Sequence, residues 1–319
     1  MKDGISGPTV PWKAVADLGT NTFQWIIAKP GPGFSRTVGC IRKVGVGIGK
    51  GGMEAGLILP EARKRGLEAL QLFVEDLKNF GIEPESALVF GTSAFRNARN
   101  GPDFGKEIQQ QTGLDVRILD GEAEAALIFE GIRACGVLDA CSEGLVVDIG
   151  GGSVEFLHCL QGKLLWKRSF EIGGLRLLEM AGDEDPPGPK AIERIRIRLE
   201  TELEPLWMYL QPHLPLDLIG CSGSFETLVD MEQVFLGNPA GQAELQPWHK
   251  LEPEAFYRHA LAFRTLNLEA RLAYPGMLAL RAPMMGVAMQ LVDLLLKKLQ
   301  STRIWVTTWC LKDGALFRE

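Results

Sequence analysis

The 319-residue chain lacks a net positive charge, closely paired cysteines and a long apolar run. Its formal net charge of −6 gives no overall attraction to nucleic acid or to an anionic membrane, so we expect neither as a partner. The six cysteines are scattered and include no C-x-x-C pair. This spacing argues against both a zinc site and a disulfide framework, and it favours reduced thiols and a cytoplasmic location.

Membrane-directing segments are also missing. Residues 1–10 contain no apolar stretch of the kind found in a signal peptide. The most apolar stretch, residues 284–296, contains Asp293 and is too short to span a bilayer, so we interpret it as a buried helix. Hydrophobic and charged contents of 46% and 23% are typical of a soluble globular protein, and the length suggests about two domains.

One short pattern occurs twice, at residues 15–22 and 146–153. Each copy has an apolar strand, an aspartate (Asp17 or Asp148), an apolar residue, a glycine, two small residues and a hydroxyl residue. A second apolar strand follows each copy, and Gln24 in the first corresponds to Glu155 in the second. The repeat predicts two strand-turn-strand hairpins that face each other across a cleft.

The repeated turns have the composition of a phosphate-metal site. Tight glycine turns bring backbone N–H groups close to phosphate oxygens, and an aspartate at a strand end can hold a divalent cation. Either turn alone would be an ordinary β-turn, but the matching pair favours binding. The predicted phosphate-binding residues of the two turns are Gly19, Thr20, Asn21, Thr22, Gly150, Gly151, Gly152 and Ser153.

A third turn, residues 220–224, follows a predicted strand and precedes a predicted helix. It is interpreted either as a generic strand-helix turn or as a further source of amides for an anion, from Gly223 and Ser224.

Alternating strands and helices predict an α/β fold with mixed sheets. We expect helices at 59–80, 121–134 and 190–210, strands at 145–149, 154–160, 164–171, 217–220 and 304–307, and a loop near 237–250. The domain boundary is predicted between residues 135 and 143, which gives domains of 1–134 and 135–310.

Two further segments make the order of motifs specific. They are Gly91-Thr-Ser-Ala-Phe-Arg-Asn-Ala-Arg-Asn-Gly101 and Leu119-Asp-Gly-Glu-Ala-Glu-Ala-Ala-Leu-Ile-Phe129. With the two aspartate turns, residues 220–224, Gly286 and residues 311–314, they resemble the exopolyphosphatase / guanosine pentaphosphate phosphatase (Ppx/GppA) family. This family lies in the actin–hexokinase–heat-shock ATPase superfamily, and the likeness covers nearly the whole chain.

The resemblance implies two duplicated actin-like (ribonuclease H-like) domains with five-stranded mixed sheets, flanking helices and an active site in the cleft between them. The chain looks like the short form of the family, whose last helix, here about 311–319, packs back onto the first domain. The implied activity is release of terminal phosphate from polyphosphate or guanosine pentaphosphate with Mg²⁺, for which Mn²⁺ or Ca²⁺ could substitute. A homodimer is an alternative to a monomer.

The resemblance also implies roles for residues. Glu124 falls where the family places its catalytic glutamate, which orients or deprotonates the attacking water. Asp148, Asp17 and Glu155 are the expected Mg²⁺ ligands, some of them through water. Residues Thr92, Ser93 and Arg96 match a phosphate-contacting segment; the alternative for Arg96 is a surface ion pair.

Three positions depart from the family pattern. Gln24 stands where an arginine is common, and Ala123 and Ala126 replace a glutamate and an arginine. Losing a phosphate-contacting arginine costs about 1.5–3 kcal/mol. These departures leave open a noncatalytic polyphosphate or alarmone sensor as an alternative to the hydrolase. An ATP-dependent small-molecule kinase on the same fold is a third hypothesis, although no signature for a phosphate acceptor is visible.

Overall fold

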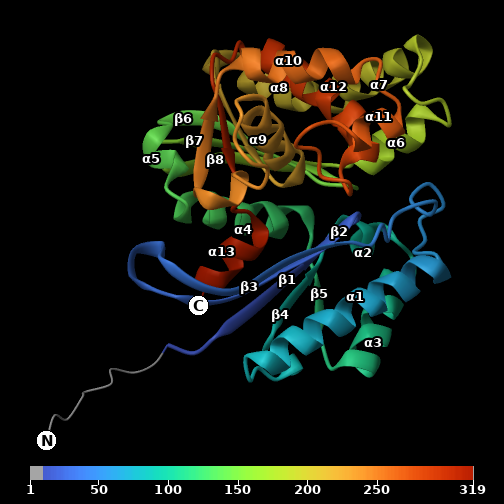
Figure 1. Ribbon diagram of the computed structural model, residues 1–319, viewed down its shortest axis with the longest axis vertical. Helices are drawn as coiled ribbons and strands as arrows, with labels where there is room; N and C mark the ends of the chain where they lie inside the picture. Colours follow the sequence, from blue (N-terminus) through green and yellow to red (C-terminus); the bar gives the residue numbers. More distant parts are fainter. Residues whose placement is uncertain (1–9, 319) are drawn as a thin grey trace, which may run out of the picture.

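The computed structural model describes residues 10–318, which form two lobes, each built on one mixed β-sheet (Figure 1). In the first lobe the strand order is β3-β2-β1-β4-β5. Strands β1 to β3 form an antiparallel meander, and β4 and β5 run parallel to β1. The strands are β1 (Lys13–Leu18), β2 (Thr22–Pro30), β3 (Arg36–Gly45), β4 (Leu88–Gly91) and β5 (Val116–Ile118). The helices are α1 (Pro60–Asn79), α2 (Ser93–Asn97), α3 (Gly101–Thr112) and α4 (Gly121–Ala134), with 3₁₀ turns η1 (Pro32–Phe34) and η2 (Pro84–Ser86).

The first sheet has apolar side chains on both faces. Because successive strand residues point to opposite faces, Ala14 and Ala16 pack in the cluster that includes Leu70 and Phe73 of α1. Val15 packs instead in the cluster that contains apolar residues of α4. The strand that carries Asp17 is therefore fixed by packing from both sides.

The second lobe has the strand order β10-β11-β9-β6-β7-β8. Strands β6 to β8 are an antiparallel meander, β9 and β11 run parallel to β6, and β10 pairs antiparallel with β11. The strands are β6 (Glu143–Ile149), β7 (Val154–Leu160), β8 (Lys163–Phe170), β9 (Asp217–Cys221), β10 (Trp248–Leu251) and β11 (Ile304–Thr307). The helices are α5 (Val137–Ala140), α6 (Gly174–Ala181), α7 (Pro189–Glu202), α8 (Glu204–Leu210), α9 (Gly223–Phe235), α10 (Pro253–Phe263), α11 (Leu268–Leu272), α12 (Ala282–Leu299) and α13 (Leu311–Phe317), with 3₁₀ turns η3 (Gln211–His213) and η4 (Ala243–Leu245).

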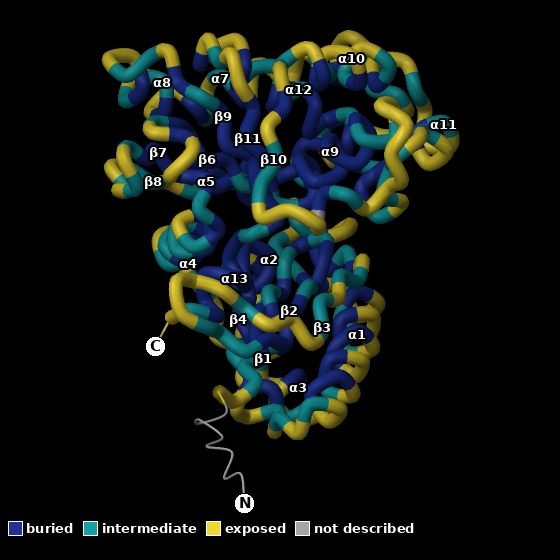
Figure 2. Tube along the Cα trace, turned by 60° about the vertical axis from the view of Figure 1, so that its left-hand side comes forward, coloured by how far each residue is buried: buried dark blue, intermediate teal, exposed yellow. Residues whose placement is uncertain are grey.

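Helices α4 and α13 lie where the two lobes meet (Figures 1 and 2). The C-terminal helix α13 leaves the second lobe and packs against α4, β1 and β2 of the first. The apolar cluster around these helices also contains Val146 and Leu157 of the second sheet, so one buried core joins the lobes. The predicted boundary near residue 135 falls between the two sheets and stays a prediction.

The predicted elements are largely present, and the exceptions have local causes. The second sheet has six strands, because β10 forms inside the segment that the sequence predicted as a loop. The helix predicted at 190–210 is divided at Leu203, where Pro205 occupies the first turn of α8. Proline has no N–H to continue the hydrogen-bond ladder of the preceding helix. No helix among residues 10–318 is long and apolar enough to cross a membrane.

Candidate active site

The two repeated sequences form hairpins with the same geometry. In the first, Gly19 N donates to Thr22 O at 3.0 Å, and in the second, Gly150 N donates to Ser153 O at 3.1 Å. Their registers also match, because Asp17 pairs with Gln24 and Asp148 pairs with Glu155. The correspondence of Gln24 with Glu155 in the sequence repeat therefore holds in the structure, because each lies opposite the aspartate of its own hairpin.

The two turns face each other closely across the interface between the lobes. A Cβ on Gly152 would lie 2.4 Å from Ser93 Oγ, and one on Gly151 would lie 3.2 Å from Asn21 Cβ. Glycine is thus required at Gly152 by the approach of the opposite lobe. Between the turns lies a cavity of about 60 Å³, room for about two waters at about 30 Å³ each.

The predicted residues that line this cavity are Asp17, Gly19, Thr20, Asn21, Thr22, Thr92, Ser93, Glu124, Asp148, Gly150, Gly151, Gly152, Ser153 and Glu155. They come from β1, β2, α2, α4, β6 and β7 and from the turns between these elements. Strand ends and one helix start, far apart in the sequence, thus bring four carboxyl groups to one small space.

Burial and mutual repulsion make these carboxyl groups hard to ionise. Burial raises the pKa of Asp17 to about 6 and that of Asp148 to about 6. Burial and the charge of Asp148 raise the pKa of Glu155 to about 8. For Glu124, burial and the charge of Glu155 raise the pKa well above its usual range. Such a group of buried acids is the environment that a divalent cation would stabilise in the ionised form.

Glu124 lies in the first turn of α4, where Asp120 caps the helix by accepting a hydrogen bond from Ala123 N. Its carboxylate accepts a hydrogen bond from Arg96 Nη1 at 2.8 Å, and Arg96 also donates to Leu119 O at 3.0 Å. Arg96 is not in the cavity wall but behind Glu124, so it fixes the orientation of that carboxylate. Glu122, on the same helix, is exposed.

Several buried polar atoms in the cavity have no partner within the described chain. They are Asp17 Oδ1 and the hydroxyl oxygens of Thr20 and Thr22. Buried polar groups are normally hydrogen-bonded, so these atoms are suited to a ligand. Carboxylate and hydroxyl oxygens are the donors that Mg²⁺ prefers, and Asp17, Asp148 and Glu155 offer such a set.

The third predicted turn contributes differently from the expectation. Ser222 lines the cavity, whereas Gly223 and Ser224 do not. They begin α9, and a Cβ on Gly223 would lie 2.1 Å from Arg281 Cζ. The guanidinium of Arg281 therefore lies directly over Gly223, and it lines the cavity where Gly223 and Ser224 do not.

Two functional candidates were missed by the sequence analysis. Arg281, which caps α12, is only 9% exposed, and its guanidinium has no hydrogen-bond or ion-pair partner among residues 10–318. Glu171, just after β8, accepts a hydrogen bond from Ser93 Oγ at 3.0 Å and pairs with Arg96 and Arg176. Neither residue belongs to a repeated pattern, and no local signal distinguishes them.

Comparisons with known proteins match this geometry. A model of the Ppx/GppA phosphatase family matches residues 26–319. A solved exopolyphosphatase from Cytophaga hutchinsonii is similar at 34% identity, with a TM-score of 0.90 and 96% of each chain covered. The Aquifex aeolicus member of the Ppx/GppA family is similar at 21% identity, with a TM-score of 0.75 and 96% of each chain covered.

The chain belongs to the Ppx/GppA phosphatase family.

Its fold is accordingly the duplicated actin-like α/β architecture of that family, with mixed sheets of five and six strands. Gln24 of this phosphatase donates its side-chain amide to Asp17 Oδ2 at 2.9 Å and to Cys310 Sγ at 3.6 Å. The residue at the position where the resemblance led us to expect an arginine thus holds one of the cavity aspartates in place.

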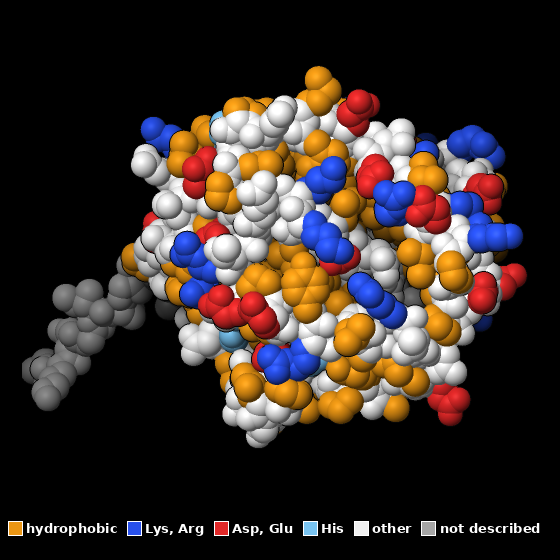
Figure 3. All heavy atoms as spheres, turned by 90° about the horizontal axis from the view of Figure 1, so that it is seen from above, with side chains coloured by type: hydrophobic (Ala, Val, Ile, Leu, Met, Phe, Trp, Pro, Cys, Tyr) orange, Lys and Arg blue, Asp and Glu red, His pale blue; other side chains and the backbone are white. Residues whose placement is uncertain are grey.

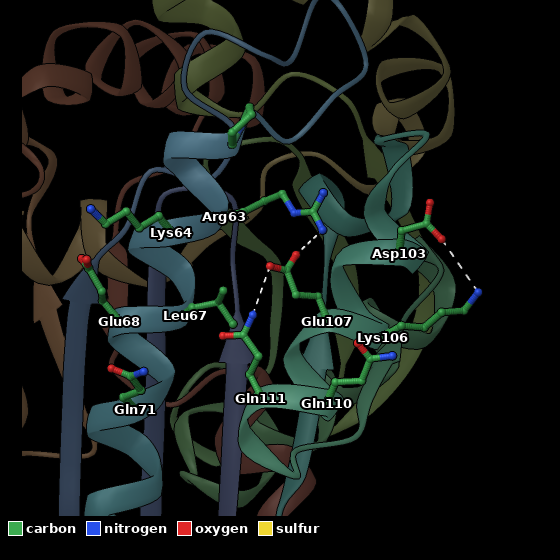
Figure 4. A pocket seen from close by; sticks show the side chains of 11 residues that line it. Arg63, Lys64, Leu67, Glu68, Gln71, Asp103, Lys106, Glu107, Gln110 and Gln111 are labelled. Carbon is green, nitrogen blue, oxygen red and sulfur yellow. Dashed lines mark hydrogen bonds and ion pairs between the residues drawn. The ribbon is translucent and has the colours of Figure 1, made fainter.

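A larger groove, of about 750 Å³, lies between α1 and α3 (Figure 4). It does not include any of the four carboxyl groups of the cavity between the hairpins. Its charges neutralise each other, since Arg63 pairs with Glu107 and Lys106 with Asp103. The face of the second lobe in Figure 3 likewise intersperses basic and acidic side chains. Neither surface has the single-sign charge that would attract a polyanion.

Proposed function

We propose that this phosphatase hydrolyses the terminal phosphoanhydride bond of inorganic polyphosphate. The observation that carries the proposal is the cavity between the two hairpins, where four buried carboxyl groups face unpartnered hydroxyls. The exopolyphosphatase at 34% identity supports polyphosphate as the substrate class. The turn amides and Arg281 are suited to bind the terminal phosphates. The phosphates are negatively charged, and the guanidinium of Arg281 has no hydrogen-bond or ion-pair partner among residues 10–318.

Asp148, Asp17 and Glu155 are proposed to hold Mg²⁺. Bound there, the ion would neutralise charge on the phosphate oxygens and on the leaving group. Its positive charge also favours ionised carboxylates in the cavity, which lowers the raised pKa values toward the ordinary range.

Glu124 is proposed to orient and deprotonate the attacking water. Phosphoryl transfer to water requires a group that positions the nucleophile and accepts its proton. Glu124 is buried, lines the cavity and is held by Arg96 at 2.8 Å. The positive charge of Arg96 favours the ionised carboxylate that this role needs.

The test is phosphate release from medium-chain polyphosphate with Mg²⁺, for the wild type, Glu124→Gln and Glu122→Gln. Glu122→Gln is a matched control, because it removes the same charge from an exposed site on the same helix. We expect Glu124→Gln to lower kcat by about 10²–10⁴-fold, the usual contribution of general acid–base catalysis. Glu122→Gln should stay close to the wild type.

Other outcomes favour other functions. Polyphosphate binding without phosphate release would favour a sensor. ATP consumption that requires an organic acceptor would favour a kinase. A parallel assay with guanosine pentaphosphate separates the two substrates, and equal release by Glu124→Gln and the wild type would refute the role of Glu124.

A further inference from the structure

Glu143, His158 and His213 converge on the second lobe, outside the cavity. Glu143 begins β6, and His158 lies on β7. In the register of this pair His158 faces Leu145, two residues from Glu143, so the two side chains share one face of the sheet. His213, the last residue of η3 (Gln211–His213), approaches the same face after α8.

The three side chains offer their ligand atoms around one point. His158 Nε2 lies 3.1 Å from Glu143 Oε1, and His213 Nδ1 lies 3.9 Å from the same oxygen. All three atoms lie within 4.8 Å of one another. In a tetrahedral zinc site with bonds of about 2.0–2.2 Å, neighbouring ligand atoms are about 3.3–3.5 Å apart. The two distances to Glu143 Oε1 bracket that value, and a modest movement of His213 toward the other two groups would bring all three distances close to it.

The exposure of the three side chains suits entry of a metal ion from solvent. The His158 side chain is fully buried, while those of His213 and Glu143 are 31% and 35% exposed. The site is therefore closed on the side of His158 and open to solvent on the side of Glu143 and His213.

A further hydrogen bond orients the fixed ligand. His158 Nδ1 lies 3.0 Å from Tyr209 Oη, and Tyr209 stacks on Trp166 with ring centroids 5.0 Å apart. Metal-binding histidines commonly use their second ring nitrogen in this way, which sets the tautomer and the ring plane.

We propose that Glu143, His158 and His213 bind a transition-metal dication of the zinc type. Two imidazole nitrogens and one carboxylate suit zinc, whereas Mg²⁺ prefers oxygen ligands alone. The scattered cysteines argue only against a cysteine-bound zinc, and this set contains none. Water completes the coordination.

Binding shifts one proton. Without metal, we assign the proton to His158 Nε2, which then donates to Glu143 Oε1. With metal, Nε2 gives its lone pair to the ion, and the proton resides on Nδ1, which donates to Tyr209 Oη. The ion then connects the β6–β7 hairpin to the segment that follows α8, which stabilises the folded second lobe by mass action.

The test uses the full chain after its metal has been removed with a chelator. Zn²⁺ is then titrated into the protein by calorimetry. Excess Mg²⁺ is present throughout to occupy the cleft carboxylates. We expect one tightly bound Zn²⁺ per wild-type chain. Loss of a residue that only supports a metal ligand typically weakens metal binding by about 10–100-fold. His213→Ala and Glu143→Gln each remove a ligand itself, so each should weaken Zn²⁺ binding by at least this factor. His249→Ala is the control, because His249 lies on β10, at the opposite edge of the sheet from β8, and its ring contacts Ala243 O.

Two more variants locate the ion. Tyr209→Phe should weaken Zn²⁺ binding by about 10–100-fold through loss of the orienting bond. Asp148→Asn should leave the affinity unchanged, because it alters the cleft only. Far-ultraviolet circular dichroism of the metal-free variants checks that each is folded. Absence of stoichiometric Zn²⁺ in the wild type, or unchanged affinity in both His213→Ala and Glu143→Gln, would overturn the proposal.

Discussion

Glu171 connects the two lobes across the cleft, and one of its contacts is with Arg96, which also holds the carboxylate of Glu124. Its carboxylate lies 3.3 Å from Arg96 Nη2 of the first lobe and 2.9 Å from Arg176 Nη2 of its own lobe. Ser93 Oγ donates to it at 3.0 Å. A cavity of about 60 Å³ is small for a chain of phosphates, so we expect the lobes to separate when substrate enters. Separation breaks the contacts of Glu171 with Arg96 and Ser93.

The substitution Glu171→Gln weakens this cross-cleft connection. Hydrogen bonds to charged groups contribute about 1.5–3 kcal/mol, and neutral ones about 0.5–1.5 kcal/mol. The carboxylate makes two contacts across the cleft, but its side chain is 38% exposed, so solvent screening reduces the difference. We take a net effect of about 1 kcal/mol, which corresponds to about a fivefold change in an equilibrium constant.

The expected result is a KM for polyphosphate about fivefold lower than in the wild type, with kcat changed by less than about twofold. Steady-state phosphate release measures both quantities. Glu200→Gln on α7 is the matched control, because its side chain is 41% exposed and loses the same charge far from the cleft. An unchanged or higher KM in Glu171→Gln would refute the idea that these contacts oppose opening of the cleft. A large fall in kcat alone would instead assign Glu171 to the chemistry.

Two further substitutions test the geometry of the cavity. Gly152→Ala places a methyl group 2.4 Å from Ser93 Oγ, so it should hold the lobes apart and lower phosphate release by more than tenfold; solution scattering should show an expanded particle without ligand. Burial raises the pKa of Asp148 to about 6, so the ionised form costs roughly 2–3 kcal/mol in the metal-free fold above that pH. Asp148→Asn should therefore raise the unfolding temperature in EDTA at pH 7.5 while it abolishes activity, and added Mg²⁺ should stabilise only the wild type; a lower unfolding temperature in EDTA would contradict this reasoning.

The sequence predicted the site where its chemistry is local. An aspartate before a glycine turn between two apolar strands is typical of a hairpin, and the repeat of that pattern predicted two matching hairpins, which the structure has at Asp17 and Asp148. Glu124 was found because the segment that contains it, residues 119–129, resembles the Ppx/GppA pattern, and it lies in the first turn of α4. The alternation of strands and helices was enough for the α/β class.

Residues that depend on long-range packing were not predictable. Arg281 reaches the cavity because α12 begins beside the turn at Gly223, and no pattern in either segment reports that proximity. Glu171 acts through Arg96, 75 residues earlier in the chain. β10 forms because β11 offers an edge for pairing, and the four residues of β10 show no strand pattern of their own. These contacts between segments far apart in the sequence form only when the lobes have assembled.

The matching hairpins are not chemically equivalent, and this difference locates the cation. In the first hairpin Gln24 donates to Asp17 Oδ2, so only Oδ1 remains available. In the second hairpin Glu155, opposite Asp148, is an acceptor whose Oε1 is held by Ser169 Oγ at 2.7 Å. The second hairpin therefore offers two carboxylates to a cation, and the first offers one oxygen together with the hydroxyls of its turn. We expect the metal to lie nearer to Asp148 and Glu155, and the terminal phosphate to lie toward the turn of the first hairpin, within reach of a water held by the carboxylate of Glu124.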